Sequence, residues 1–463
     1  MKNKTIYRCS NCGRQESKWL GRCPNCQEWD TMEEIVVESS RSTSSTSPRA
    51  VRKKTVATRL LNVESSNSDR LVTSINEFNR VMGGGIVKDS VTIITSQPGG
   101  GKSTLVLAVA NDIASQGFKV LYASGEESES QIKNRADRIL KSINENLWII
   151  SDTSMDNVLE SIKEIDPDLI VIDSIQTFTL EDFPGSRAGS PTQTMECANS
   201  LVRIAKNEER PRAVIMIGQM TKDDELAGLR ALEHLVDTVL YIESESNDEL
   251  RSLLATKNRF GSTGEMGFFS MSERGMISID NPSEYFISNR SFNELVPGST
   301  LTVLREGTRP IIAEVESLVT KTFTPFPARI SESIKREQLS TLISILEQRG
   351  RISLYDKDVV VKSTGGLRFK EQAVNLAVIM SIVSSVYDKG IPNDTAFISD
   401  VGLTGELKKV PSLEMRIKEL DRRGFTKVYI AKDAASSNLK VENIDVIALK
   451  ALQEVIRHVF SGN

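Results

Sequence analysis

A glycine-rich segment between an apolar run and a helical pattern constrains this chain more than any other feature. The segment reads Ser96-Gln97-Pro98-Gly99-Gly100-Gly101-Lys102-Ser103-Thr104, with apolar residues at 91–94 before it and a helical pattern at 105–110 after it. A strand, a glycine-rich loop and a helix in this order point backbone N–H groups at the phosphates of a nucleoside triphosphate. Lys102 would reach the β and γ oxygens, and Ser103 would complete a Mg²⁺ shell. We therefore predict a phosphate-binding loop at residues 96–104.

Strand and helix patterns alternate from about residue 70 to residue 290. The strand candidates are 91–95, 119–123, 147–150, 168–172, 213–217, 238–242 and 252–256. This alternation predicts an α/β fold with a mainly parallel sheet and helices on both faces. Ligands of such sheets bind at the carboxyl ends of the strands, so we expect the functional side chains there. The 463 residues are enough for two or three domains.

The net charge and the hydropathy of the chain argue against a uniformly basic protein, a membrane protein and an exported protein. The net charge of −4 excludes a global basic field, so any surface that binds nucleic acid is expected to be local. The sequence has no run of about eighteen apolar residues that would span a membrane. Its N-terminus carries no hydrophobic signal region. We expect a cytoplasmic protein without membrane contact, whose thiols stay reduced.

Four of the 5 cysteines form two pairs near the N-terminus, namely Cys9, Cys12, Cys23 and Cys26. Two C-x-x-C knuckles that face each other supply four thiolates, a ligand set suited to tetrahedral Zn²⁺. So short a segment buries too little apolar area to fold without metal. We predict a structural zinc ribbon over residues 1–38, with a redox pair or unrelated thiols as the alternatives. The fifth cysteine, Cys197, is expected to be a buried apolar thiol.

Residues 39–69 read as a linker rich in serine, threonine and basic residues. The stretch 41–59 carries six basic residues and no acidic one. This composition has little to bury and predicts a flexible tether. Its charges fit contact with phosphates equally well. The expected organisation is therefore ribbon 1–38, linker 39–69, an α/β domain 70–290 and a further domain 291–463.

Acidic residues follow two of the predicted strands. Asp173 ends the strand at 168–172 and is the candidate that orients the Mg²⁺ shell, as in a Walker B element. Glu126 and Glu127 follow the strand at 119–123, where a carboxylate can hold the attacking water and take its proton. The first turn of a helix also favours acidic residues. Composition alone therefore leaves a catalytic and a structural role for these glutamates equally open.

Two more polar groups follow predicted strands. Gln219 lies just after the strand at 213–217, where its amide can sense a γ-phosphate. The pentad Lys257-Asn258-Arg259-Phe260-Gly261 follows the strand at 252–256. Its two cations suit a phosphate of a neighbouring subunit or of DNA, and a solvated basic turn is the alternative.

Together these motifs resemble one family. The cysteine ribbon, the stretch Gly83-Gly84-Gly85-Ile86-Val87, the glycine-rich loop, the stretch Gly125-Glu126-Glu127-Ser128 and the pentad occur in the order typical of bacterial RadA (Sms), a family of RecA-like ATPases of DNA repair and recombination. The pentad is the most specific of these elements. The resemblance covers the chain from about residue 5 onward, excluding the serine-rich linker.

The resemblance implies a hexameric, ATP-driven DNA motor, similar to replicative helicases of the RecA-like class. Such a motor promotes branch migration on single-stranded and branched DNA beside a RecA-type recombinase, and it uses ATP, Mg²⁺ and Zn²⁺. The resemblance also implies that Glu126, rather than Glu127, is the catalytic glutamate. By the same comparison, Lys257 and Arg259 couple ATP across a subunit interface with DNA binding.

Three residues depart from the family pattern. Ser96 replaces the first glycine of the loop, Gln219 replaces a histidine, and Leu229 stands where proline is expected. Glutamine still donates a hydrogen bond to a phosphate oxygen. We expect these changes to leave the fold intact and to affect the rate of turnover.

After residue 291 the pattern resembles the proteolytic domain of Lon proteases, which the RadA family carries in inactive form. An amphipathic helix ends at Gly350, a buried helix spans 373–387, a hairpin turn spans 402–407 and another helix spans 413–423. Strands are expected at 359–361, 396–399 and 427–431. We therefore expect an α+β domain that forms a hexameric collar, with the basic residues Lys408, Lys409, Arg416, Arg422 and Arg423 available to DNA. A solvated surface explains any one of these charges equally well.

Peptidase activity is not expected in this domain. An active site of this kind needs a serine and a lysine of lowered pKa. The resemblance places Ala373 at or beside the nucleophile position and Arg416 near the lysine position, and a guanidinium cannot act as a neutral base. Lys362 and Ser363 are adjacent on a strand, so their side chains point to opposite faces.

Three functions therefore compete. The first is an ATP-hydrolysing DNA motor, which the motifs favour. The second is a nucleotide-switched scaffold for DNA or a recombinase, with little turnover, which Ser96 and Gln219 favour. The third is an ATP-dependent protease, which the missing serine–lysine pair disfavours.

Overall fold

The computed structural model describes residues 4–9, 15–16, 21, 26, 32–37, 59–62, 70–219, 228–244, 249–291, 294–434 and 441–460. The chain divides into two compact units, Met1–Ser66 and Asn67–Asn463. Within the described residues, no helix is both long and apolar enough to cross a membrane.

The first unit contains a small antiparallel sheet. Its central strand, β1 (Lys4–Cys9), pairs with β2 (Gln15–Glu16) on one side and with β3 (Met32–Val37) on the other. Cys9, the first predicted zinc ligand, ends β1 opposite Met32. A short 3₁₀ helix, η1 (Leu60–Asn62), lies in the same unit.

A nine-stranded sheet forms the first half of the second unit. Its strand order is β14-β13-β12-β11-β6-β10-β9-β7-β8. The six strands from β11 to β8 in this order are parallel, and β12, β13 and β14 extend the sheet antiparallel. The bounds are β6 (Val91–Ser96), β7 (Val120–Ser124), β8 (Leu147–Ser151), β9 (Leu169–Asp173), β10 (Ala213–Gln219), β11 (Thr238–Ser244), β12 (Leu250–Asn258), β13 (Met266–Ser272) and β14 (Gly275–Ser278).

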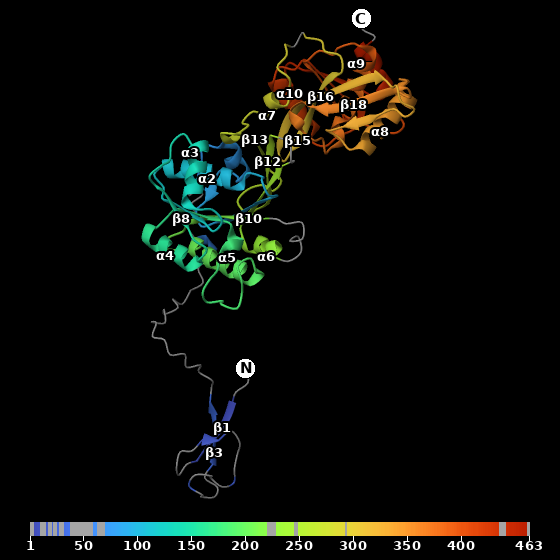
Figure 1. Ribbon diagram of the computed structural model, residues 1–463. Helices are drawn as coiled ribbons and strands as arrows, with labels where there is room; N and C mark the ends of the chain where they lie inside the picture. Colours follow the sequence, from blue (N-terminus) through green and yellow to red (C-terminus); the bar gives the residue numbers. More distant parts are fainter. Residues whose placement is uncertain are drawn as a thin grey trace. The chain divides into compact units, whose positions relative to one another are not determined.

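Helices cover both faces of this sheet, as the alternating pattern predicted (Figure 1). One face packs against α1 (Asn76–Val81), α2 (Lys102–Ser115) and α3 (Glu129–Ile139). The other face packs against α4 (Met155–Ile165), α5 (Pro191–Ala205) and α6 (Gly228–Leu235). Successive residues of a buried strand serve opposite faces. On β9, for example, Leu169 and Val171 belong to the first core, and Ile170 and Ile172 to the second.

Local sequence sets the starts of these helices. Ser128 caps α3, since its hydroxyl accepts from the Gln131 N–H while the Gln131 side chain accepts from the Ser128 N–H. At the start of α5, which has Pro191 in its first turn, the Ser190 hydroxyl accepts from the Gln193 N–H. Such caps satisfy N–H groups that the first helical turn leaves without partners. A short strand pair precedes the sheet, β4 (Arg70–Leu71) with β5 (Ile86–Val87).

A seven-stranded mixed sheet forms the second half of this unit, in the order β17-β18-β16-β15-β19-β22-β23. Helices α8, α9 and α11 contribute to the core on one side, and α10 to the core on the other. A hairpin of β20 (Asp400–Val401) and β21 (Leu407–Lys408) stands beside it. The remaining bounds are β15 (Ser299–Glu306), β16 (Arg309–Lys321), β17 (Arg329–Ser331), β18 (Lys357–Ser363), β19 (Thr395–Ile398), β22 (Lys427–Ala431), β23 (Asp445–Leu449), α7 (Pro282–Tyr285), α8 (Arg336–Ile345), α9 (Asn375–Tyr387), α10 (Leu413–Arg422) and α11 (Leu452–Phe460).

The segment around α7 packs on the seven-stranded sheet. The N–H of Ile312 donates to Ser283 Oγ, and the N–H of Glu314 donates to the Phe286 carbonyl. Arg290 pairs with the buried carboxylate of Glu314 at 2.8 Å. The chain has therefore joined the second sheet before residue 290.

Candidate functional site

The glycine-rich loop joins β6 to α2 at the carboxyl edge of the parallel strands. Gly99 and Gly101 have φ of 78° and 94°, a region that residues with side chains rarely adopt. A Cβ at Gly100 would collide with Ser96 Oγ, and one at Gly101 would lie 2.5 Å from Met271 Cε. Glycine is therefore required both by the backbone and by the close approach of Ser96 and the β13–β14 hairpin.

Ser96 fits into the loop although the usual pattern has glycine there. Its buried hydroxyl lies 2.7 Å from the Gln97 carbonyl oxygen and donates to it. Lys102 Nζ donates to Ser96 Oγ at 3.0 Å and to the Ser96 carbonyl at 3.3 Å. Burial lowers the pKa of Lys102, and the carboxylates of Asp173 and Glu126 oppose that shift. The lysine thus lies within the loop and within the field of two acids.

Asp173 and Ser103 supply oxygen atoms near this loop. Asp173 ends β9 and is buried, and its Oδ2 accepts a hydrogen bond from the Tyr122 hydroxyl at 2.6 Å. Burial and the adjacent Asp173 carboxylate raise the pKa of Tyr122, so the phenol remains a donor. Ser103 lies in the first turn of α2. Carboxylate and hydroxyl oxygens are ligands that Mg²⁺ prefers, so this pair fits the predicted ion.

Glu126 connects the ends of two strands at the same edge. Its Oε1 accepts hydrogen bonds from Ser174 Oγ and, at 2.8 Å, from Gln219 Nε2. Glu126 follows β7, Ser174 follows β9, and Gln219 ends β10. The Gln176 amide fixes the backbone of Gln219, accepting from its N–H at 3.3 Å and donating to its carbonyl at 3.1 Å. The two predicted polar groups, Glu126 and Gln219, therefore meet.

The neighbouring Glu127 is engaged elsewhere. Its Oε1 pairs with Arg135 of α3 at 2.5 Å, and its carbonyl accepts from the Ser151 hydroxyl at 2.7 Å. Glu126 is exposed, whereas Glu127 is partly buried. The geometry separates two glutamates that composition could not, because only Glu126 is linked to Gln219.

The basic pentad lies at the opposite edge of the sheet from the glycine-rich loop. Asn258 pairs with Thr238, the first residue of β11, since β12 runs antiparallel to β11. The loop follows Ser96, which pairs with the later residue Ile242 of β11. The expectation that the functional side chains gather at one edge is therefore wrong for Lys257 and Arg259, because the direction of β12 is reversed.

The pentad and the Gly83–Gly85 stretch pack together. Asn258 Nδ2 donates to the Val81 carbonyl at 3.3 Å, and the Phe260 N–H donates to Asn258 Oδ1 at 2.9 Å. A Cβ at Gly261 would lie 3.0 Å from the Cα of Gly83. Arg70 then joins the two segments by donating to the carbonyls of Gly85 and Phe260, each at 3.0 Å. Two motifs far apart in the sequence thus form one substructure.

The two cations of the pentad differ in their surroundings. Lys257 Nζ donates to the carbonyls of Glu233 and Val236, at the end of α6, at 2.5 and 2.8 Å. Burial, then the nearby Arg259, lowers the pKa of Lys257. Arg259 pairs with buried Asp237 at 3.0 Å, yet 55% of its side chain stays exposed. Arg259 is therefore the member of the pentad that is better placed to contact another molecule.

Asp237 ties the pentad to the sheet. Its Oδ2 accepts from the Val91 N–H at 3.1 Å, and Lys206 pairs with its Oδ1 at 2.9 Å. The side chain of Asp237 is 2% exposed. Sequence reasoning missed Asp237, as it missed Tyr122 and Ser174, although Ser174 directly follows the predicted Asp173.

Arg416 is not available to DNA, in contrast to the prediction. It is fully buried and binds both carboxylate oxygens of Glu371, at 2.7 and 2.6 Å, and the carbonyls of Val303 and Pro411. Arg422 and Arg423 each pair with Glu419. Lys408 and Lys409 are exposed, as expected.

Lys362 and Ser363 do not form a catalytic dyad. Ser363 is buried and its hydroxyl donates to the Leu367 carbonyl at 2.6 Å. Lys362 is exposed and pairs with Glu316 at 3.2 Å. The two side chains lie on opposite faces of β18, as predicted. Ala373 is buried in a 3₁₀ turn just before α9.

The other predicted residues are placed as follows. Cys197 is buried in the apolar core that α5 helps to form, as predicted, and burial raises the pKa of its thiol to about 12. Cys9 ends β1, Cys26 is partly buried, and Cys12 and Cys23 lie outside the described residues. Leu229 lies in α6. The side chains of Cys9 and Leu229 also lie outside the described part of the chain.

Two family models and a solved structure match parts of this chain. Residues 7–34 match the rubredoxin metal binding domain family, and residues 57–225 match the AAA domain family. The crystal structure of the RadB recombinase matches 45% of this chain, with a TM-score of 0.37 and 21% identity.

Full-length relatives are more similar. The chain is 40% identical to the DNA repair protein RadA of Bacillus subtilis over 100% of both chains. It is 39% identical to the protein of the same name from Listeria monocytogenes over 98% of both chains. It is also 40% identical to that of Streptococcus pyogenes, over 99% of this chain and 100% of the relative. The chain therefore belongs to the family of the DNA repair protein RadA.

Proposed function

We propose that this chain is an ATP-driven DNA motor that promotes branch migration during recombinational repair. The observation that carries the proposal is the hydrogen bond between Gln219 and Glu126, which joins the ends of β10 and β7 beside the phosphate loop. A γ-phosphate bound there would compete for the Gln219 amide, and Glu126 would then be released to act on water. Such an arrangement links occupancy of the loop to the strand that carries Gln219.

Each residue at this edge then has a distinct role in hydrolysis. Lys102 leaves Ser96 and binds the β and γ oxygens of ATP. Glu126 orients the attacking water and accepts its proton. Ser103 and Asp173 would hold Mg²⁺, which supplies charge neutralisation at the phosphates. Tyr122 keeps the Asp173 carboxylate in place through its hydroxyl.

The opposite edge serves a neighbouring subunit or DNA. Because Lys257 and Arg259 lie across the sheet from the loop of their own chain, they are suited to act on the ATP of a neighbour. A closed homo-oligomer of the hexameric kind provides such a neighbour for every subunit. Arg259, with its partly exposed guanidinium, is the residue that we assign to this contact.

The remaining parts of the chain act as binding modules. The four thiols Cys9, Cys12, Cys23 and Cys26 would hold a structural Zn²⁺, in agreement with the metal-binding family that matches residues 7–34. The seven-stranded half would form a Lon-like collar without peptidase activity. Its exposed Lys408 and Lys409 are suited to DNA, whereas Arg416 is not.

Two measurements test this function. ATP turnover should rise when single-stranded DNA is added, and a branched DNA should be resolved with ATP but not with a non-hydrolysable analogue. Turnover that is indifferent to DNA, together with no strand displacement, would contradict a motor.

One observation favours the alternative of a slow, nucleotide-switched scaffold that binds DNA or a RecA-type recombinase. Ser96 offers Lys102 a hydroxyl partner that glycine would not provide. In a scaffold, DNA binding would depend on ATP while turnover stayed low with every DNA. The same assays therefore discriminate between the two functions.

A further inference from the structure

A large cavity lies in the seven-stranded half of the chain, away from the phosphate loop. Its volume is about 1170 Å³, and it opens to solvent. This volume exceeds the range of about 300–1000 Å³ that is usual for small-ligand sites. Its walls come from the end of β17, from α8, from the segment before α9 and from the β20–β21 hairpin.

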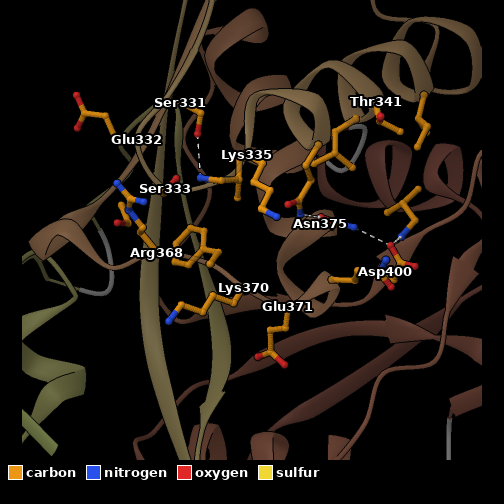
Figure 2. Close-up of a pocket in the computed structure, with 18 of the residues that line it drawn as sticks. Ser331, Glu332, Ser333, Lys335, Thr341, Arg368, Lys370, Glu371, Asn375 and Asp400 are labelled. Carbon is orange, nitrogen blue, oxygen red and sulfur yellow. Dashed lines mark hydrogen bonds between the residues drawn. The ribbon is translucent and has the colours of Figure 1, made fainter. Parts of the chain in front are cut away.

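Basic side chains line the cavity and outnumber the acidic ones. Figure 2 shows Arg368 and Lys370 on one side, the Asn375–Asp400 pair on the other, and Lys335 between them. Lys408 adds a fourth cation. Of the acidic lining residues, Glu371 is neutralised by the buried Arg416. Glu332 and Asp400 remain, and Lys370 also pairs with Glu243 at 3.3 Å. Lys408 likewise pairs with Glu406 at 3.9 Å. Among the lining residues themselves, four cations stand against three carboxylates, and a concave surface with this balance favours anions.

The amino end of α8 strengthens this preference. Helix α8 begins just after Lys335, and no side chain among the described residues caps it. The helix dipole favours negative charge at such an end. Beside it, Ser333 is 3% exposed, and its Oγ has no hydrogen-bond partner in the part of the chain that the structure describes. A buried hydroxyl without a partner is costly, and Ser333 lines the cavity. It therefore marks a place for a polar atom of a ligand.

The floor of the cavity is apolar and already ordered. The side chains of Ile334, Leu342 and Phe369 contribute to it, and Leu403 lies exposed beside the opening. Asn375 is held between Gln338 and Asp400, with both hydrogen bonds at 2.7 Å. Because the floor residues are at most 6% exposed, Leu403, which is 73% exposed, offers most of the apolar surface that aliphatic side chains of a ligand can contact.

We propose that this cavity binds a short, extended, acidic peptide segment of a partner protein. Carboxylates of the peptide would face Lys335, Arg368 and Ser333, and its apolar side chains would contact the exposed Leu403. A nucleic-acid strand fits less well, because bases need aromatic side chains for stacking. Among the described lining residues, Phe369 is the single aromatic, and it is only 4% exposed.

The test is selection of a random peptide library displayed on phage against the full-length protein. Peptides rich in aspartate or glutamate and in leucine or isoleucine should be enriched, and their affinity should fall as salt screens the charges. Enrichment of basic or uncharged peptides, or no enrichment, would overturn the proposal.

Variants on α8 locate the bound peptide. Lys335→Glu should weaken binding of a selected, fluorescently labelled peptide by about ten-fold, since a like charge replaces an attractive one. Arg336→Glu is the matched control, because Arg336 is the next exposed cation on the same helix and does not line the cavity. Its effect should stay below about two-fold.

A second pair of variants tests the space rather than the charge. Thr341→Trp should block the cavity and abolish peptide binding, whereas Ser344→Trp, one turn further along α8, should not. Basal ATP turnover should be unchanged in all four variants, which shows that the nine-stranded half is folded, and unchanged thermal unfolding midpoints would show the same of the seven-stranded half. Equal peptide binding by the Thr341 and Ser344 variants would refute the site. A second outcome would also refute the proposal. If Lys335→Glu and Thr341→Trp lost binding of a labelled oligothymidine but kept peptide binding, the cavity would bind a nucleic-acid strand instead.

Discussion

At the scale of single residues, the adjacent glutamates show how geometry divides chemically identical groups. Glu126 accepts from Ser174 and Gln219 at the nucleotide edge, whereas Glu127 pairs with Arg135. We predict that Glu126→Gln lowers ATP turnover by about 10²–10⁴-fold, because an amide cannot take the proton of water. ATP affinity should change little, and turnover together with binding of a fluorescent ATP analogue would measure both.

Glu127→Gln is the control for this prediction. The substitution weakens the pair with Arg135, so it should reduce thermal stability while most of the turnover remains. If Glu127→Gln abolished hydrolysis and Glu126→Gln did not, the assignment of roles would be reversed.

Residues that belong to a motif were easier to predict than their partners. The loop residues 96–104 and Asp173 lie beside strands in a recognisable order. Tyr122 lies on a strand of its own, 51 positions before Asp173, and nothing in the sequence pairs them. Arg416 was predicted as a surface cation from its charge. Only the fold reveals that Glu371, the partner that allows its burial, lies beside it.

At the scale of elements, the sequence located strands better than it oriented them. The seven strand candidates of the α/β region all occur, within a few residues of their predicted bounds. Apolar patterns carry no information on direction, so the reversal of β12 could not be foreseen. The strands β13 and β14 were also missed. They place Met271 against the phosphate loop.

The pair of Arg416 on α10 and Glu371 before α9 supports a prediction on stability. Arg416→Met should destabilise the seven-stranded half by about 2–3 kcal/mol, because Glu371 and the carbonyls of Val303 and Pro411 lose a donor. This loss is small for a broken buried ion pair, because Glu371 is 28% exposed and water partly screens its charge. Thermal unfolding followed by calorimetry measures the effect. Arg422→Met, on an exposed cation of the same helix, should shift the midpoint much less.

Glu306 at the end of β15 predicts a dependence of stability on pH. Burial, with the nearby Glu371 and Glu243, raises its pKa from 4.5 to about 7, although Lys370 opposes the shift. The folded state then binds a proton that the unfolded state has released. Ionisation of Glu306 therefore does not lower the free energy of unfolding below pH 4.5. As the pH rises from there towards 7, the free energy of unfolding falls by at most about 1.4 kcal/mol per pH unit.

Glu306→Gln removes this titration. The variant should be more stable than the parent at about pH 8, by roughly 1–3 kcal/mol, and the difference should shrink at about pH 5. Unfolding midpoints across that range test the sign. The exposed Glu332→Gln provides the control, and a parent whose stability rose between these two pH values would contradict the assignment.

At the scale of the whole molecule, the two edges of the nine-stranded sheet carry complementary halves of one proposed site. The phosphate loop lies at one edge and Arg259 at the other, so no single subunit brings them together. If hydrolysis needs both, each active site must be shared between neighbours. Each of the variants Lys102→Ala and Arg259→Ala, measured by itself, should then lose DNA-stimulated ATP turnover.

Mixing these two variants before assembly distinguishes a shared site from a private one. An interface becomes complete when an intact loop from the Arg259→Ala subunit meets an intact arginine from the Lys102→Ala subunit. Random assembly forms this pairing at about one interface in four, so about a quarter of the parental turnover should return. If Arg259 served the loop of its own chain, every subunit in the mixture would carry one defect and no turnover would return. Recovery in the mixture, with none in either variant alone, can arise only from a site built by two chains.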